Sequence, residues 1–167
     1  MGDGKGPAWL QVATGYLGTK EVTGKGSNPT ILKWAKKAGG WIANFFTDDD
    51  IPWCALFVNA CLDEAGLKGT GSLAARSFET WGRPLPEPAL GAVLVFSRNG
   101  GGHVGFYLGE NSTRFRVRGG NQGNAVSDTW ILKSRLTAIR WPTAGTDPSG
   151  GPIQLADDGS PVSTNEA

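Results

Sequence analysis

Two residues of this sequence have the chemistry of a nucleophile and a base. Cys54 lies in the segment DDDIPWCALFVNACLDEAG, and His103, the single histidine of the chain, lies in GGGHVGFYLGE. A helix is expected from about Pro52, with Cys54 in its first turn, where unpaired N–H groups and the helix dipole favour a thiolate and can hold an oxyanion. The pattern therefore predicts nucleophilic catalysis by a Cys–His pair. The alternatives are a small core cysteine and a histidine that is satisfied within a turn.

A Cys–His pair needs a third polar group that fixes the orientation and tautomer of the imidazole. Residues 119–125 read GGNQGNA and follow RFRVR, a strand pattern that is expected to neighbour the strand beginning at His103. Asn121 is therefore the candidate for the third position, although asparagine between glycines is also a common turn residue. Glu110 is a weaker candidate, because it lies at the far end of the His103 strand.

Cys61, the second cysteine, is expected to be a core residue. It follows Cys54 by seven residues in one helix, a rise of about 10 Å. That separation exceeds the roughly 4.4–6.8 Å between Cα atoms that a disulfide allows. The spacing also matches no common zinc pattern. Two unpaired thiols are typical of a protein made in a reducing cytoplasm.

The elements that would position these residues are helices first and strands second. Helix signals cover residues 7–17, 29–38 and 52–65, with a shorter helix in 72–81. A proline-rich segment at 83–91 then marks the change from helical to strand-like patterns. Period-two patterns follow at 92–98, 103–109, 114–118 and 136–141. Helices followed by an antiparallel meander predict an α+β fold rather than a wound α/β sheet.

Length and composition favour one folded domain in residues 1–142. The chain has 167 residues, of which 39% are hydrophobic and 19% charged, and no apolar run approaches a membrane span. All 16 Lys and Arg lie in residues 1–142 with 11 acids, which gives this part a charge of +5. The remaining four acids follow in residues 143–167, a segment rich in Gly, Pro, Ser and Thr that is predicted to be disordered. A mildly basic body suits an anionic target, but ordinary surface charge explains it equally simply.

Taken together, DDDIPWCALFVNACLDEAG, GAVLVF, GGHVGFYLGE and GGNQGNAVS resemble the cysteine, histidine-dependent amidohydrolase/peptidase (CHAP) group and the NlpC-related wall hydrolases. The resemblance covers roughly residues 8–142. It implies a papain-like α+β fold in which N-terminal helices pack on a C-terminal antiparallel β-sheet. It also implies that Cys54 is the nucleophile, His103 the general base and acid, and Asn121 the orienting residue. Many relatives carry a carboxylate near the third position, whereas the aligned stretch here offers Gly119.

Further positions resemble those that surround the site in similar sequences. Substrate contacts are expected at Glu21, Asn28, Ser77, Trp81, Trp53 and Gly102, with a purely structural role as the alternative for each. No cofactor and no metal are expected. The run Asp48-Asp49-Asp50 could bind calcium as in some relatives, but it lacks the ligand order of a calcium loop, and helix capping explains it without a metal.

The expected function is a peptidoglycan hydrolase that cuts an amide bond, as an N-acetylmuramoyl-alanine amidase or a peptide endopeptidase of the phage endolysin type. The expected partner is peptidoglycan, with no nucleic acid and no stable membrane insertion, and the protein is expected to be a monomer. Made in the cytoplasm without a signal peptide, it would act in the periplasm or cell wall after holin release, virion delivery or specialised secretion. The alternatives are a non-catalytic wall-binding or virion structural module, and a cysteine peptidase or acyltransferase with another substrate.

Overall fold

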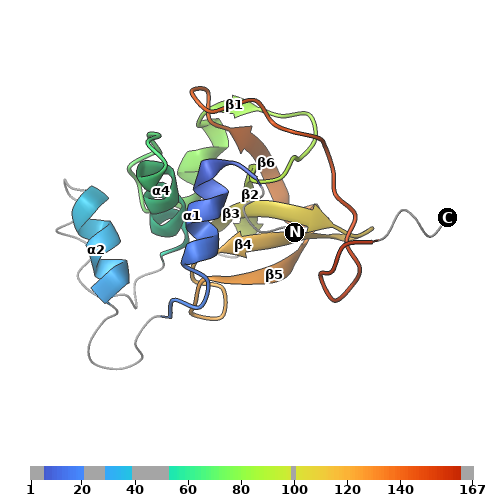
Figure 1. Cartoon of the computed structure of the whole chain (residues 1–167), viewed down its shortest axis with the longest axis horizontal. Helices are drawn as coiled ribbons and strands as arrows, with labels where there is room; N and C mark the ends of the chain where they lie inside the picture. Colours follow the sequence, from blue (N-terminus) through green and yellow to red (C-terminus); the bar gives the residue numbers. More distant parts are fainter. Residues whose placement is uncertain (1–5, 21–28, 39–52, 99–100, 163–167) are drawn as a thin grey trace.

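The fold is a mixed one, built from a six-stranded antiparallel sheet and a group of helices beside it (Figure 1). The computed structural model describes residues 6–20, 29–38, 53–98 and 101–162. The strand order is β1-β6-β2-β3-β4-β5. The strands are β1 (Arg83–Pro84), β2 (Val93–Arg98), β3 (Gly101–Glu110), β4 (Arg114–Gly119), β5 (Ser127–Leu132) and β6 (Leu136–Trp141). The α+β class is therefore confirmed.

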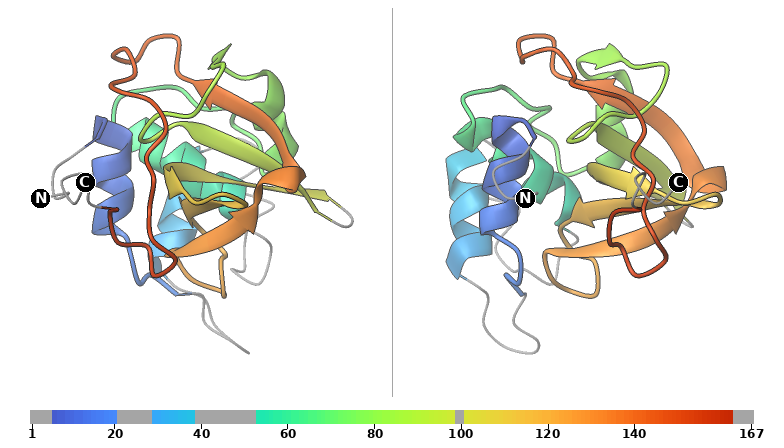
Figure 2. Two further views of the ribbon diagram at one scale, coloured as in Figure 1. Left: turned by 90° about the vertical axis from the view of Figure 1, so that its right-hand side faces the viewer. Right: turned by 45° about the vertical axis from the view of Figure 1, so that its right-hand side comes forward.

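The helices of the described part come mostly from the N-terminal half. They are α1 (Ala8–Gly15), α2 (Pro29–Ala38) and α4 (Cys54–Glu64), with the 3-10 helices η1 (Ala75–Thr80) and η2 (Lys133–Arg135). The two further views in Figure 2 show α1, α2 and α4 grouped on one side of the sheet. Each was predicted close to its observed bounds; the predicted helix in residues 72–81 is a 3-10 helix.

Helix α4 is the scaffold element that carries the cysteine, and the core surrounds it. All residues from Cys54 to Leu62 are buried. Phe57 packs against Phe106 of β3 on one side and against Trp34 of α2 on the other, with ring centroids 6.1 and 5.5 Å apart. Burying one such side chain stabilises the fold by about 1.5–3 kcal/mol. The start of α4 is consequently held in a fixed position relative to β3.

Strand β3 is the central strand that carries the histidine. It pairs with β2 through Phe96–His103 and with β4 through Phe106–Arg118. Strand β4 follows its predicted alternation, because Phe115 and Val117 are buried while the intervening arginines are more exposed. Strand β5 was not predicted. Its sequence SDTWIL begins with polar residues and is only half-buried, so its pairing with β4 gives a weak sequence signal.

From Thr143 to residue 162 the chain packs on the sheet and is not disordered. The Glu110 N–H donates to the Ile153 carbonyl (2.8 Å), and the Leu155 N–H donates to the Glu110 carbonyl (2.9 Å). The Tyr107 hydroxyl accepts the Ile153 N–H at 2.9 Å. The prediction of a disordered tail is therefore wrong for residues 143–162. Its polar composition hid one apolar residue, Ile153, that packs against the core, and residues 163–167 lie outside the described part.

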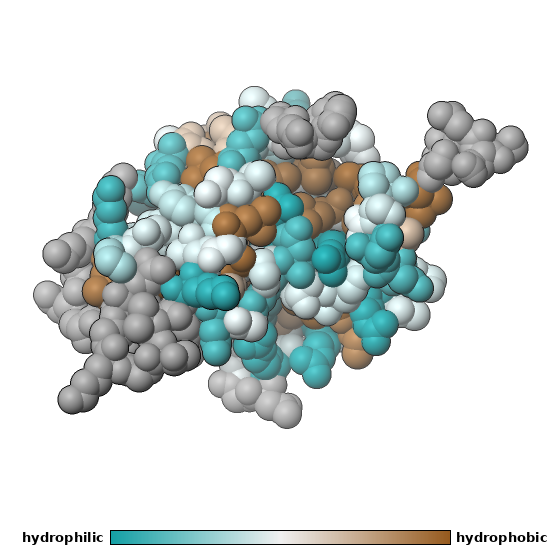
Figure 3. Space-filling view, turned by 60° about the horizontal axis from the view of Figure 1, so that its bottom comes forward, coloured by the Kyte–Doolittle hydropathy of each residue, from teal (hydrophilic) through white to brown (hydrophobic). Residues whose placement is uncertain are grey.

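In Figure 3, hydrophobic atoms on the face shown form patches that are separated by hydrophilic side chains. Within the described residues, no helix is long and apolar enough to span the hydrocarbon core of a bilayer.

Candidate active site

The imidazole of His103 is buried and held by one specific partner. The side chain is 1% exposed, and its Nε2 lies 2.8 Å from Oε1 of Gln122. Gln122 follows β4 in the turn that leads to β5, and its backbone N–H donates to the Ala125 carbonyl at 3.0 Å. The Ser127 hydroxyl donates to the Gln122 carbonyl at 2.8 Å. The turn is therefore closed by its own hydrogen bonds, and it presents the Gln122 side chain to the ring.

The hydrogen bonds of the Gln122 amide determine the tautomer of His103. Its Nε2 donates to the carbonyls of Val117 (3.1 Å) and Ser127 (2.6 Å), so both amide hydrogens are used. The amide oxygen must then face the imidazole, and because a carbonyl oxygen only accepts, the ring Nε2 carries the hydrogen. The neutral ring consequently presents the lone pair of Nδ1. This atom has no hydrogen-bond partner among the described residues.

Cys54 opens helix α4 and lies against β3 next to the histidine. The Tyr107 N–H donates to the Ala92 carbonyl on the β2 side. Because N–H directions alternate along an antiparallel strand, the Val104 N–H points to the opposite side, beyond the last paired residue of β4. The sulfur of Cys54 accepts a hydrogen bond from this N–H. Cys54 is thus placed beside Val104, the residue that follows His103 in β3, where β4 ends.

The resting site is a neutral thiol beside a neutral imidazole. Burial raises the pKa of Cys54, and hydrogen bonds from the Val104 N–H and from the first amides of α4, together with the charge of Arg98, offset only part of that effect. Burial lowers the pKa of His103 to about 4; the hydrogen bond to Gln122 opposes this shift and the charge of Arg98 adds to it. The expectation that the helix N-terminus makes Cys54 a thiolate is therefore wrong, because desolvation exceeds the helix contribution.

The lowered pKa predicts acid-sensitive stability. His103 takes up its proton at about pH 4 when folded and at about 6.5 when unfolded, so its contribution is complete above pH 6.5 and is lost as the pH falls toward 4. The free energy of unfolding should decrease by about 2 kcal/mol between pH 7 and pH 5, as measured by urea titration. The change in this pH range is assigned to His103 because it is the single histidine of the chain. In His103→Gln the dependence should disappear, and an equal slope in that variant would contradict the assignment.

Gly119 and Gly120 leave the space that the Gln122 side chain and the start of α4 occupy. A Cβ on Gly119 would lie 2.7 Å from Oε1 of Gln122. A Cβ on Gly120 would lie 2.7–2.8 Å from Phe57 and the Trp53 ring. Any side chain at these positions would displace Gln122 from the imidazole or lift the turn from α4. Steric crowding therefore explains why both positions are glycine. The crowding at position 119 also explains why no carboxylate is found there.

The third position is corrected by one residue. Gln122, not Asn121, makes the hydrogen bond to the imidazole, while Asn121 has a φ of 59° and is half-buried in the turn. Asparagine tolerates this left-handed conformation better than most residues. Glu110 is also ruled out as the orienting residue, because it binds the Tyr107 hydroxyl and Lys133 (both 2.6 Å) at the other end of β3.

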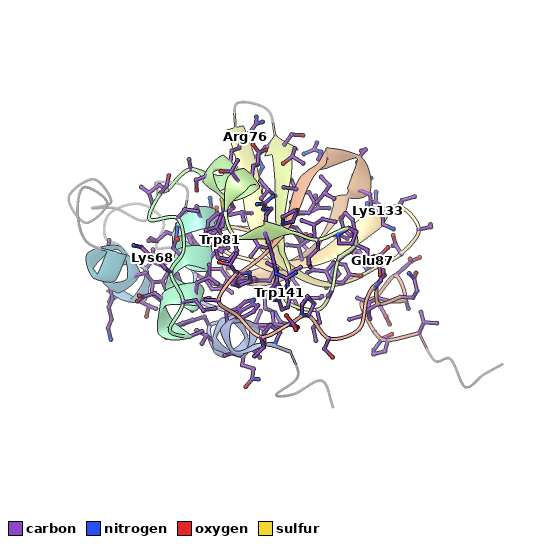
Figure 4. All side chains as sticks on the ribbon, turned by 90° about the horizontal axis from the view of Figure 1, so that it is seen from above. Lys68, Arg76, Trp81, Glu87, Lys133 and Trp141 are labelled. Carbon is purple, nitrogen blue, oxygen red and sulfur yellow. The ribbon has the colours of Figure 1, made fainter. Side chains whose placement is uncertain are left out.

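Of the expected substrate contacts, one is contradicted and two have structural partners. Trp53 is fully buried against Gly120 and packs beside Trp34, so it has no surface to offer a substrate. The Ser77 hydroxyl donates to Oγ1 of Thr70 (2.8 Å). The indole N–H of Trp81 donates to the Lys68 carbonyl (3.0 Å), and Figure 4 shows these two residues side by side. Both side chains are half-buried, and a substrate contact there stays a prediction.

The remaining predicted positions lie beside the site or outside the described part. Gly102 adjoins His103, and a Cβ there would lie 2.8 Å from Cγ of Arg76 and 3.0 Å from the Phe96 carbonyl. This crowding explains by packing alone why position 102 is glycine. Glu21, Asn28 and the three aspartates 48–50 lie outside the described residues, and within the described ones no three metal-ligating side chains come together.

The second cysteine behaves as predicted. Cys61 is fully buried, is not disulfide-bonded, and its thiol pKa is raised well above the ordinary value, first by burial and then by the charge of Glu64. Among the described residues, nothing around Cys61 would activate its thiol.

In comparisons with known proteins, no protein-family model matches this chain, and no curated protein matches it in sequence.

Proposed function

We propose that this protein is a cysteine hydrolase with a papain-like arrangement of Cys54, His103 and Gln122, and that it cuts an amide bond of peptidoglycan. The observation that carries the proposal is the unpartnered Nδ1 of a buried imidazole whose other nitrogen is fixed by Gln122. A histidine kept only for packing would leave this atom desolvated and unsatisfied at a cost of about 1–3 kcal/mol. A base that must accept a proton needs that lone pair.

The mechanism follows from the neutral resting state. As the Cys54 sulfur attacks the carbonyl carbon and the C–S bond forms, its proton moves to Nδ1 of His103, and the orphan N–H groups at the start of α4 stabilise the oxyanion. The imidazolium then gives the proton to the amine nitrogen, the C–N bond breaks and a thioester remains. Water attacks the thioester, losing its proton to Nδ1, and the thiol is regenerated as the carboxylic acid leaves. Gln122 holds the ring throughout as a positioning residue.

The thiol must come within hydrogen-bond distance of Nδ1 for this transfer. In free enzymes such contacts are often longer than in the substrate complex. Peptidoglycan as the substrate rests on the resemblance of the motifs around Cys54 and His103 to wall hydrolases, and action at the cell wall follows from that substrate.

Digestion of purified sacculi tests the proposal. Wild-type protein should release fragments with new amine termini, and mass spectrometry of the products should identify one bond, either between muramoyl and alanine or within the peptides. Retention on sacculi without new amine termini would overturn the proposal in favour of a non-catalytic wall-binding module. Cleavage of casein or another protein with intact sacculi would instead assign the site to a different substrate.

A further inference from the structure

A basic pocket adjoins His103. Its volume is about 250 Å³, and it lies between the ends of β2 and β3 and the strand β5 with η2. It is lined by Phe96, Ser97, Arg98, His103, Arg114, Trp130, Ile131, Leu132 and Arg135. His103 belongs to this lining, whereas Cys54 does not.

The charge of this pocket is positive only. Arg98, Arg114 and Arg135 come from three separate elements, and no Asp or Glu is part of the lining. The ion pairs of the described residues involve other cations: Arg76, Arg83, Arg118 and Lys133. Lys133, labelled in Figure 4, is thus neutralised by Glu110 although it precedes Arg135 by two residues. Three exposed arginines that line one pocket without a carboxylate make it positively charged, and this charge favours an anionic ligand.

The pocket is electrostatically connected to the reacting groups. The charge of Arg98 lowers the pKa of both Cys54 and His103, so this guanidinium is close enough to act on each. The volume is below the roughly 300–1,000 Å³ of a typical ligand site, which suits a group the size of one amino acid rather than a sugar pair. Ile131 offers an aliphatic wall that can hold the apolar part of such a residue.

We infer that this pocket binds a free carboxylate on the amine-side half of the substrate, so that the protein prefers peptides whose residue after the cut bond carries unamidated carboxyl groups. This inference rests on the proposed function, in which His103 donates the proton to the leaving amine. The half that leaves as the amine must lie on the His103 side, and the pocket is on that side. Arginine recognises carboxylates through paired, charge-assisted hydrogen bonds that an amide cannot reproduce.

The test compares matched substrates and variants. Two sets of soluble muropeptides are compared: one has free carboxyl groups on the amine-side half, and the other has carboxamides there. Each set is hydrolysed by wild type, by the triple variant Arg98→Gln/Arg114→Gln/Arg135→Gln, and by Arg83→Gln. Arg83 is a matched control, because it is also a surface arginine but pairs with Asp147 at β1. The loss of kcat/KM in the triple variant should be at least 30-fold greater on the carboxylate substrate than on the carboxamide, because the effect of Arg98 on the reacting groups is common to both. Arg83→Gln should stay within twofold of wild type on both.

A binding measurement separates this inference from the hydrolase proposal. Cys54→Ala protein, which cannot turn over, is titrated with meso-diaminopimelate, an amine with two free carboxyl groups on the same residue, and with its carboxamide form, with and without the three arginine substitutions. Tighter binding of the free acid that is lost in the arginine variant supports the pocket even if no sacculus is ever cut. Equal binding of the two forms, or a triple variant that loses equally on both substrates, would overturn it. Unchanged urea midpoints should show that the arginine variants remain folded.

Discussion

Replacing Cys54 by alanine should abolish hydrolysis of sacculi while leaving the protein folded. The sulfur forms the covalent bond in the proposed mechanism, and Nδ1 of His103, which has no hydrogen-bond partner among the described residues, is the base that takes its proton. Removal of one member of such a constellation costs on the order of 10⁴-fold or more in kcat. The substitution removes one buried sulfur from a helix start that alanine also accepts, so the unfolding midpoint should change little. Release of amine termini, followed over hours, measures the loss.

Cys61→Ala is the matched control for this experiment. It removes the same chemical group from the same helix, two turns further along and fully buried. The variant should lose about 1–2 kcal/mol of stability, because a small cavity forms, yet keep wild-type kcat. Hydrolysis by Cys54→Ala at the wild-type rate would refute the nucleophile, and inactivity of a folded Cys61→Ala protein would show that the assignment of the two thiols is reversed.

The cysteine and the histidine could be identified from the sequence because each carries a local signal. A cysteine at a helix start and a single histidine after three glycines are visible without tertiary information. The helix starts were equally readable, because Pro29 and the stripe of α4 are local patterns. Burial of the site is not local. It reversed the expected ionisation of Cys54, because the desolvation cost depends on the packing of α4 against β3.

The orienting residue was misplaced for a similar reason. Asn121 and Gln122 are adjacent in one turn, and nothing in GGNQGNA says which side chain faces β3. The choice depends on two carbonyl acceptors, Val117 and Ser127, one of which belongs to β5. Because the polar sequence of β5 concealed that strand, its acceptor could not be anticipated. The basic pocket was missed too, since its arginines come from β2, β4 and η2 and meet only in the fold.

Substitution of Gln122 should change both the rate and its pH dependence. Gln122→Ala removes the acceptor that holds Nε2, so the ring can rotate and kcat should fall about 10- to 100-fold. The hydrogen bond to Gln122 raises the pKa of His103, so its loss should move the acid limb of kcat/KM to lower pH. Gln122→Glu keeps an oxygen at the ring but adds a negative charge, which favours the imidazolium. Its acid limb should therefore move upward by about 1–3 units.

Asn121→Ala is the control that distinguishes orientation from turn structure. It changes the neighbouring residue of the same turn, at a φ of 59°, without removing the hydrogen bond between Gln122 and the His103 ring. Because alanine fits this conformation less well than asparagine, a loss of stability of about 1 kcal/mol is expected with an unchanged pH profile. A merely structural role for Gln122 would give the same pattern: lower stability and no movement of the acid limb in either variant. Opposite shifts of that limb in Gln122→Ala and Gln122→Glu are the result that only a group in contact with the His103 ring can produce.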